Sequence, residues 1–152
     1  VIDLPPGTGD TQLTLAQKVP VSGAAIVTTP QDIALLDARK AYRMFEKVQI
    51  PVLGVIENMS THVCSECGHE EHIFGQGGGK AMAKEYGLEF LVDVPLDVDI
   101  RLQADEGTPI TVLAPDSLAG TAYRSAALKV AAGLAKSSKD YSKVFPKIVI
   151  ES

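Results

Sequence analysis

Short apolar runs alternate with segments of helical periodicity along most of the chain. The apolar runs predict one strand that ends at Asp3 and others over residues 24–28, 52–56 and 90–94. The segments between and after them predict helices over residues 11–18, 29–48, 80–86, 98–105 and 117–136. This alternation is typical of βα units around a parallel sheet. The sequence therefore predicts an α/β fold.

Capping residues and apolar spacing refine these helices. Thr29 is expected to be the N-cap of the second helix, with Pro30 in its first turn, and Asp116 the N-cap of the last helix. The second helix carries apolar residues at roughly helical spacing: Ile33, Leu36, Met44, Phe45 and Val48. Residues 58–79 are expected to form a loop, and Gly75–Lys80 a flexible lead into the helix over 80–86.

Composition favours a single globular domain. The chain has 152 residues, of which 45% are hydrophobic and 22% charged, and it is long enough to bury a core. No internal repeat or second domain is evident. Because the chain begins with Val1 in an apolar run, it is expected to be the C-terminal portion of something longer. Residues 1–137 are assigned to one domain and 138–152 to a tail, in which 148–150 could pair as an edge strand or stay loose.

Charge and cysteine usage narrow the class of protein. The net charge is −5, without a Lys/Arg block, which argues against nucleic-acid binding. No apolar run approaches the ~20 residues of a membrane span, and the first residues do not resemble a signal peptide. The chain has two cysteines, both in one C-x-x-C, so a reducing cytoplasm is expected rather than a secreted disulfide framework.

Cys64 and Cys67 are the strongest candidates for metal ligands. Two thiols three positions apart can bind one soft metal centre, but an all-cysteine site needs four thiolates. His69 and His72 could complete a local zinc site, or a second copy of the chain could supply the missing thiolates. A redox-active C-x-x-C and an unmetallated turn are the remaining interpretations.

The segment Asp3–Asp10 is a second candidate site. An acid at the carboxyl end of a parallel strand lies where α/β sheets bind ligands, and in nucleotide hydrolases it serves Mg²⁺. A following glycine can offer its N–H to a phosphate. The alternative is a tight turn in which Asp10 caps the next helix. Asn58, taken alone, is an ordinary turn residue after a strand.

In their order, the motifs resemble the Mrp (ApbC) family of iron–sulfur cluster carriers, which are ParA/MinD-like P-loop ATPases. The motifs cover about residues 1–115: Asp3–Asp10 followed by Gln12–Thr14, Thr28–Gln31, Gly54–Ser60, Cys64–Gly68 and Ile73–Gly75. The resemblance implies a doubly wound, mostly parallel sheet of the P-loop NTPase type, truncated at its N-terminal side.

The family pattern also implies roles for individual residues. It puts Asp3 at the Mg²⁺ position and Gly7–Asp10 in the nucleotide-sensing switch loop, where Gly7 and Asp10 would take part in catalysis. It puts Asn58 beside the adenine of ATP, where a carboxamide can both donate and accept, with Pro95–Leu96 on the opposite side of the base.

The phosphate-binding loop of such ATPases is not found in this sequence. Gly75–Lys80 departs from G-x-x-x-x-G-K-[ST], because Phe74 and Ala81 stand where glycine and a hydroxyl residue are required. The chain alone is therefore expected to be inactive as an ATPase, although the complete protein would hydrolyse ATP.

The resemblance thus implies an ATP-dependent carrier that works as a homodimer. Cys64 and Cys67 of two subunits would bridge one [4Fe–4S] cluster, which is then transferred to apo iron–sulfur proteins. The alternative function is a zinc-stabilised ParA/MinD-like ATPase that positions a partner and handles no cluster.

Overall fold

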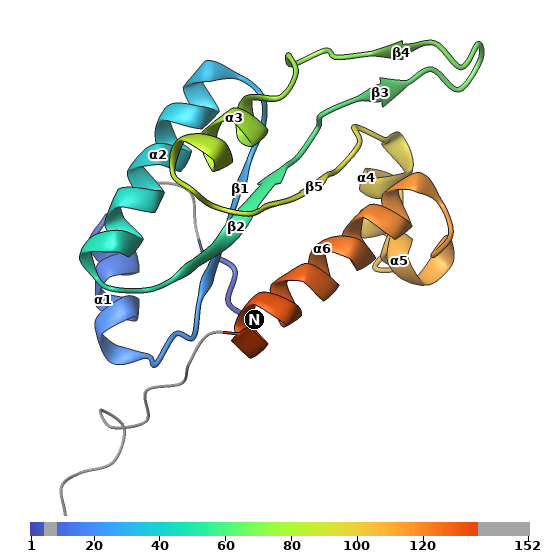
Figure 1. The fold of residues 1–152 in the computed structure, drawn as a ribbon. Coiled ribbons are helices and arrows are strands. Elements are labelled where there is room, and N and C mark those ends of the chain that lie inside the picture. The colour runs from blue at the N-terminus through green and yellow to red at the C-terminus, as the bar shows by residue number, and fades with distance from the viewer. Residues whose placement is uncertain (5–8, 137–152) are drawn as a thin grey trace, which may run out of the picture.

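The structure is a computed structural model, and it describes residues 1–4 and 9–136 (Figure 1). Its centre is a three-stranded parallel sheet in the order β1 (Ala24–Thr28), β2 (Val52–Glu57) and β5 (Phe90–Asp93). Thr28 pairs with Glu57, and Glu57 with Asp93, so the three strands end side by side. The predicted parallel sheet and its three interior strands are confirmed.

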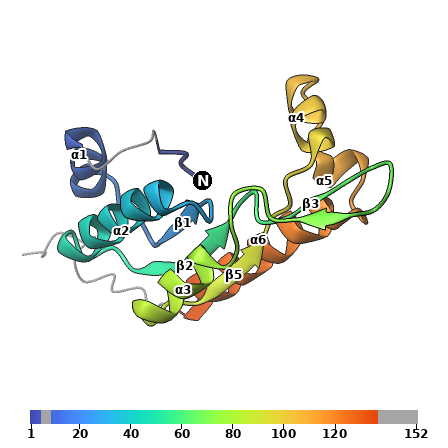
Figure 2. The same cartoon turned by 90° about the horizontal axis from the view of Figure 1, so that it is seen from above.

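Helices cover both faces of this sheet (Figures 1 and 2). α2 (Asp32–Lys47) packs on β1 and α3 (Gly78–Glu85) on β2, whereas α6 (Leu118–Lys136) packs on β5 and β2. Ile26 lies in the core beneath α2, while its neighbour Val27 lines a hollow beside α6, since successive strand residues face opposite sides. The doubly wound arrangement is therefore confirmed.

The remaining helices are short. α1 (Asp10–Lys18) precedes β1, and α4 (Val98–Asp105) and α5 (Ile110–Leu113) connect β5 to α6. α1 and α4 match their predicted ranges to within one residue. The sequence analysis missed α5, because four residues are too few to show a helical period.

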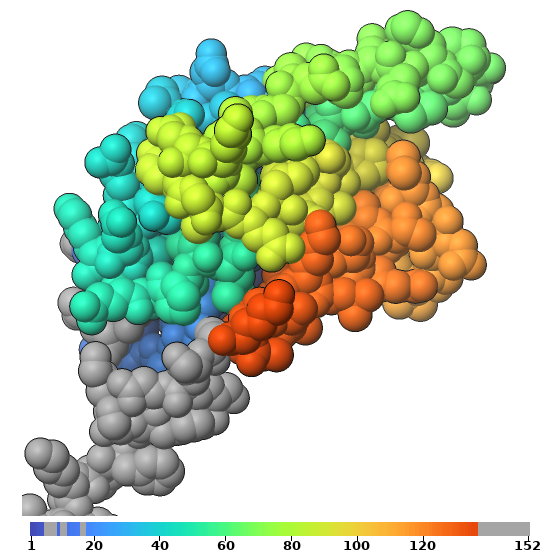
Figure 3. Space-filling view, viewed as in Figure 1, coloured from blue at the N-terminus to red at the C-terminus, as the bar shows by residue number. Residues whose placement is uncertain are grey.

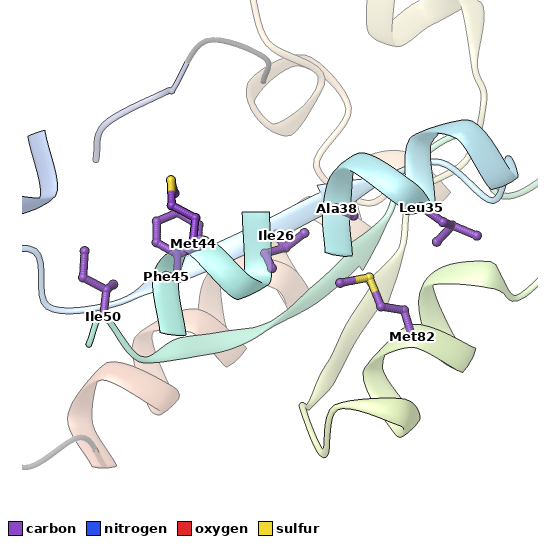
Figure 4. Packing of buried hydrophobic residues seen from close by; sticks show 7 residues of the cluster. All are labelled: Ile26, Leu35, Ala38, Met44, Phe45, Ile50 and Met82. Carbon is purple, nitrogen blue, oxygen red and sulfur yellow. The ribbon is translucent and has the colours of Figure 1, made fainter. Parts of the chain in front are cut away.

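The main core lies between α2, α3 and β1 (Figure 4). Its buried members are Ile26, Leu35, Ala38, Met44, Phe45, Ile50 and Met82. The expectation that Ile33 and Leu36 belong to the inner stripe of α2 is wrong, because they are 69% and 52% exposed, whereas Leu35 is 5% exposed. The inner stripe of α2 instead contains Leu35, Ala38, Met44 and Phe45, which pack against Ile26 and Met82.

Two of the predicted caps are wrong. α2 begins at Asp32 with Gln31 as N-cap, not at Thr29, because Pro30 is buried against the start of α3. α6 begins at Leu118, and its cap is the hydroxyl of Ser117 rather than Asp116, since Gly120 donates its N–H to Ser117 Oγ at 3.0 Å.

The first residues also differ from expectation. Residues 1–4 belong to no strand, and Val1, Ile2 and Asp3 are exposed, so the predicted strand end at Asp3 is wrong for this chain. A strand is stabilised by pairing with its neighbours, and no described strand pairs with this segment. The proposed tail, 138–152, lies outside the described residues.

The expected loop over residues 58–79 contains a small hairpin. β3 (His62–Val63) and β4 (Glu70–Glu71) pair antiparallel, with His62 opposite Glu71 and Val63 opposite Glu70. The hairpin extends from the body of the molecule (Figures 1 and 3). In the described ranges, no helix combines the length and apolar character that crossing a bilayer would require.

Candidate metal centre and nucleotide edge

Cys64 and Cys67 lie in the turn at the tip of the β3–β4 hairpin. The N–H of Cys64 donates to His69 O at 2.9 Å, and the N–H of Gly68 donates to Cys64 O at 2.8 Å. Gly68 has a φ of 70°, which the turn requires and which glycine adopts without strain. Cys64 is half-buried and Cys67 exposed, and neither forms a disulfide. The turn thus presents two thiols from the end of a projecting arm.

The turn also favours the thiolate form of Cys64. The backbone N–H of Cys67, and then that of Glu66, hydrogen-bond to its sulfur and lower the pKa of Cys64, with a further contribution from the Cys67 thiol. Partial burial and the negative charge of Glu71 oppose this shift. A thiolate is the form that binds metals, and N–H donors aimed at the sulfur stabilise it.

The nearby histidines contact the base of the hairpin. His72 Nδ1 lies 2.8 Å from Ser60 O, and His62 Nδ1 lies 3.1 Å from Leu96 O. Among the described residues, no three Cys, His, Asp or Glu side chains lie close enough together to hold a metal ion. The interpretation of Cys64, Cys67, His69 and His72 as a local zinc site is therefore not supported by the geometry.

Asn58 and Pro95–Leu96 are brought to the same edge of the sheet. Asn58 follows β2 and donates its N–H to Thr28 O at 2.7 Å, while its Oδ1 accepts from the N–H of Met59. The segments after β2 and β5 are joined by backbone hydrogen bonds, from Ser60 N–H to Val94 O and from Leu96 N–H to Thr61 O. This edge continues directly into the cysteine hairpin.

A small hollow lies on the α6 face of the sheet, next to this edge. It measures about 100 Å³ and is lined by Val27, Ile56, Asn58, Val94, Tyr123 and Ala126. Ligand pockets usually exceed about 300 Å³. The described residues alone therefore form at most one wall of a nucleotide site.

The switch-loop candidates are only partly described. Asp3 is exposed, and Gly7 lies outside the described residues. Asp10 is the first residue of α1, with Gly9 as the N-cap, so the alternative in which Asp10 caps this helix is wrong. The proposed roles of Asp3, Gly7 and Asp10 remain predictions.

Glu57 is the residue that sequence reasoning missed. It is 1% exposed, and its carboxylate accepts hydrogen bonds from the N–H groups of Gly77, at 3.1 Å, and Gly79. These N–H groups belong to the first turn of α3, where a phosphate-binding loop would hold phosphate. The carboxylate takes that place and anchors the glycine-rich segment, expected from the sequence to be a flexible lead, to the end of β2. The sequence signal that could have identified Glu57 is a charged residue at the end of an otherwise apolar strand.

Comparison with known proteins agrees with this fold and motif order. A profile of the ParA family, described as "NUBPL iron-transfer P-loop NTPase", matches residues 1–131. The chain belongs to this family. The family resemblance drawn from the motifs is thereby confirmed.

Several relatives are named iron–sulfur cluster carrier proteins. The chain is 60% identical over 134 residues to an "Iron-sulfur cluster carrier protein" of Pseudomonas fragi, covering 88% of this chain and 47% of the relative. It is 55% identical over 134 residues to the protein of that name from Escherichia coli K12, covering 88% and 36%. The chain thus spans about half the length, or less, of these relatives.

Solved structures show the same fold. A nucleotide-binding protein of Archaeoglobus fulgidus in complex with ADP is 31% identical, with a TM-score of 0.57, over 97% of this chain and 50% of that one. The cell-division ATPase MinD of Pyrococcus furiosus, at 22% identity, has a TM-score of 0.58 over 73% and 43%. This chain therefore has the α/β architecture of P-loop NTPases that its motifs predicted.

Proposed function

We propose that the full-length protein is an iron–sulfur cluster carrier that holds its cargo between two copies of the chain. One observation supports this most directly: the hairpin presents two thiols, and the described residues offer no third ligand beside them. Two such pairs, related by a two-fold axis, would supply the four thiolates of a [4Fe–4S] cluster.

The geometry of the tip suits a transferable cargo. Cys67 and the turn around it are exposed, so an acceptor protein can approach the cluster without unfolding the carrier. A cluster held between two copies is also released when the copies separate. We therefore propose that the clients are apo iron–sulfur proteins whose own cysteines displace Cys64 and Cys67.

We further propose that ATP and Mg²⁺ act at the other end of the same edge. Asn58 would contact the adenine, with Pro95–Leu96 across the base, while Asp3 would serve Mg²⁺ and Gly7–Asp10 would sense the phosphates. The family's P-loop NTPase character and the shared edge between Asn58 and Pro95–Leu96 support this assignment. The phosphate loop itself must come from chain that these 152 residues do not contain.

Metal analysis of the full-length protein tests the proposal. After anaerobic purification and reconstitution, we expect iron and acid-labile sulfide in equal amounts, little zinc, and transfer of both to an apo iron–sulfur protein. One zinc per monomer with no sulfide would instead favour the zinc-stabilised, partner-positioning ATPase.

A further inference from the structure

The segment that carries the cysteines leaves and rejoins the body of the molecule at almost the same place. It leaves β2 at Asn58 and returns at Gly77, the N-cap of α3. Glu57, the last residue of β2, bridges these two points because its carboxylate accepts from Gly77 and Gly79. Glu57 therefore joins the two ends of the cysteine segment, and His72 adds a second contact between its limbs, with Nδ1 2.8 Å from Ser60 O.

Each end of this connection is firmly anchored. The backbone of Glu57 pairs with Thr28 on one side and accepts from Val94 N–H at 2.8 Å on the other. α3 is held by Met82, which is fully buried, and by an ion pair of 3.0 Å between Arg39 and Glu85. If the Glu57 carboxylate shifts, we therefore expect the hairpin to move, while the sheet and α3 stay in place.

The glycines of α3 are matched to the carboxylate. A Cβ on Gly79 would lie 3.0 Å from Glu57 Oε2 and 3.1 Å from Glu57 Cβ. Gly77 donates to the same carboxylate from a φ of 73°, a left-handed conformation that glycine adopts at little cost. Charged acceptors form the stronger hydrogen bonds to backbone N–H groups, and a buried carboxylate depends on them.

We propose that Glu57 is a positioning residue. It holds the cysteine hairpin in a fixed position relative to the edge of the sheet that carries Asn58 and Pro95–Leu96. Glu57 adjoins Asn58. Beyond it, the hydrogen bonds from Ser60 N–H to Val94 O and from Leu96 N–H to Thr61 O connect this anchored end of β2 to the start of the hairpin. This role rests on the proposed carrier function. Glu57 would keep Cys64 and Cys67 where the thiols of a second copy can bind the same cluster.

Amide hydrogen exchange of the metal-free, full-length protein, read by NMR, tests this. Glu57→Gln replaces one acceptor oxygen by an NH₂ group, so one glycine N–H loses its partner. We expect about tenfold faster exchange at Gly77 and Gly79, and also at Ser60, Cys64 and Leu96. The Ala24 amide, bonded to Pro51 O far from the hairpin, should exchange as in the unchanged protein. Glu89→Gln, at an exposed acid, is the matched control.

Faster exchange at the glycines alone would reduce Glu57 to a helix cap and overturn the proposal, as would equal acceleration at Ala24. If Glu57→Gln does not fold, Gly79→Ala perturbs the same contact from the other side and should give the same pattern. Gly133→Ala, whose Cβ would make only an ordinary contact at 3.5 Å, is its control.

Cluster retention then links this positioning to function. We expect the cluster to be lost about tenfold faster from Glu57→Gln than from the unchanged protein, followed by its visible absorption, with partial rescue in Glu57→Asp, which keeps the charge. Equal cluster lifetimes would overturn the link between Glu57 and the hairpin thiols. A protein that binds no cluster even when unchanged would disprove the carrier function, while the exchange data would still decide the role of Glu57.

Discussion

Cys64 is the thiol whose chemistry the fold changes most clearly, because two backbone N–H groups and the Cys67 thiol lower its pKa. In the metal-free 152-residue chain with Cys67→Ser, where Cys64 is the remaining cysteine, its alkylation by iodoacetamide should reach half its maximal rate below the usual pH of about 8.5. The curve should return toward the usual pH in urea, since the N–H donors are then lost. Coinciding folded and unfolded curves would contradict this.

The same shift has a consequence for stability. Because the folded pKa of Cys64 lies below the unfolded one, the folded state gains stability as pH rises. This contribution is fully present above the unfolded pKa and is lost as the pH falls through the folded pKa. It concerns the metal-free protein, in which the thiolate has only hydrogen bonds to stabilise it.

Single substitutions separate the two metal sites considered for the cysteines. In a cluster shared by two copies, Cys64→Ala or Cys67→Ala removes two of four thiolates at once, so each variant should lose nearly all iron and sulfide. His69→Ala should retain both, because His69 is an exposed hairpin residue. Metal analysis after reconstitution measures this. Bound zinc without sulfide, lost to the same extent in the cysteine and histidine variants, would instead indicate a local zinc site.

At the scale of elements, the start of α3 has no room for additional atoms. A Cβ on Gly78 would lie 2.6 Å from Leu35 Cδ1 and 2.8 Å from Pro30 O, and the backbone oxygen cannot easily move. Gly78→Ala should therefore lower the free energy of unfolding by about 1–3 kcal/mol, measured by urea denaturation. Gly133→Ala, inside α6, where the added Cβ would make only an ordinary contact with Leu53, should be neutral or stabilise by up to about 1 kcal/mol. Equal stabilities would show that α3 can shift.

At the scale of the whole molecule, cargo and oligomeric state should change together. If four thiolates from two copies bind one cluster, reconstitution should convert full-length monomers to dimers with about four irons per dimer. Light scattering coupled to size-exclusion chromatography measures the change, and Cys67→Ala should remain monomeric. A reconstituted monomer that retains iron and sulfide would rule out the bridging arrangement.

The 152-residue chain by itself should have negligible ATPase activity, at the level of a protein-free blank. Its glycine-rich segment is not a phosphate loop, and Glu57 already takes the N–H groups at the start of α3. Phosphate release, compared with that of the full-length protein, measures this. Turnover by the chain alone, at the rate of the full-length protein, would contradict the assignment of the missing loop.

The sequence by itself determined the elements with a strong local pattern. Apolar runs such as 24–28 and 52–56 became strands, and the alternation of strands and helices predicted the parallel sheet, because burial of apolar faces and backbone pairing follow from local periodicity. The spacing of Cys64 and Cys67 likewise marked the proposed metal site without any structure, since two thiols within one turn need no long-range contact to meet.

Only the tertiary structure decided what depends on contacts between distant segments. The start of α2 moved to Asp32 because Pro30 packs against α3, and a two-residue strand pair emerged from a predicted loop because its partners lie seven or more residues apart. The contact between Glu57 and the start of α3 is the clearest case. Its carboxylate meets N–H groups twenty and twenty-two residues later, and no local pattern encodes that meeting. Local periodicity predicts where strands and helices form, whereas long-range packing decides which of their residues are buried, as for Leu35 in place of Ile33 and Leu36, and what those residues contact.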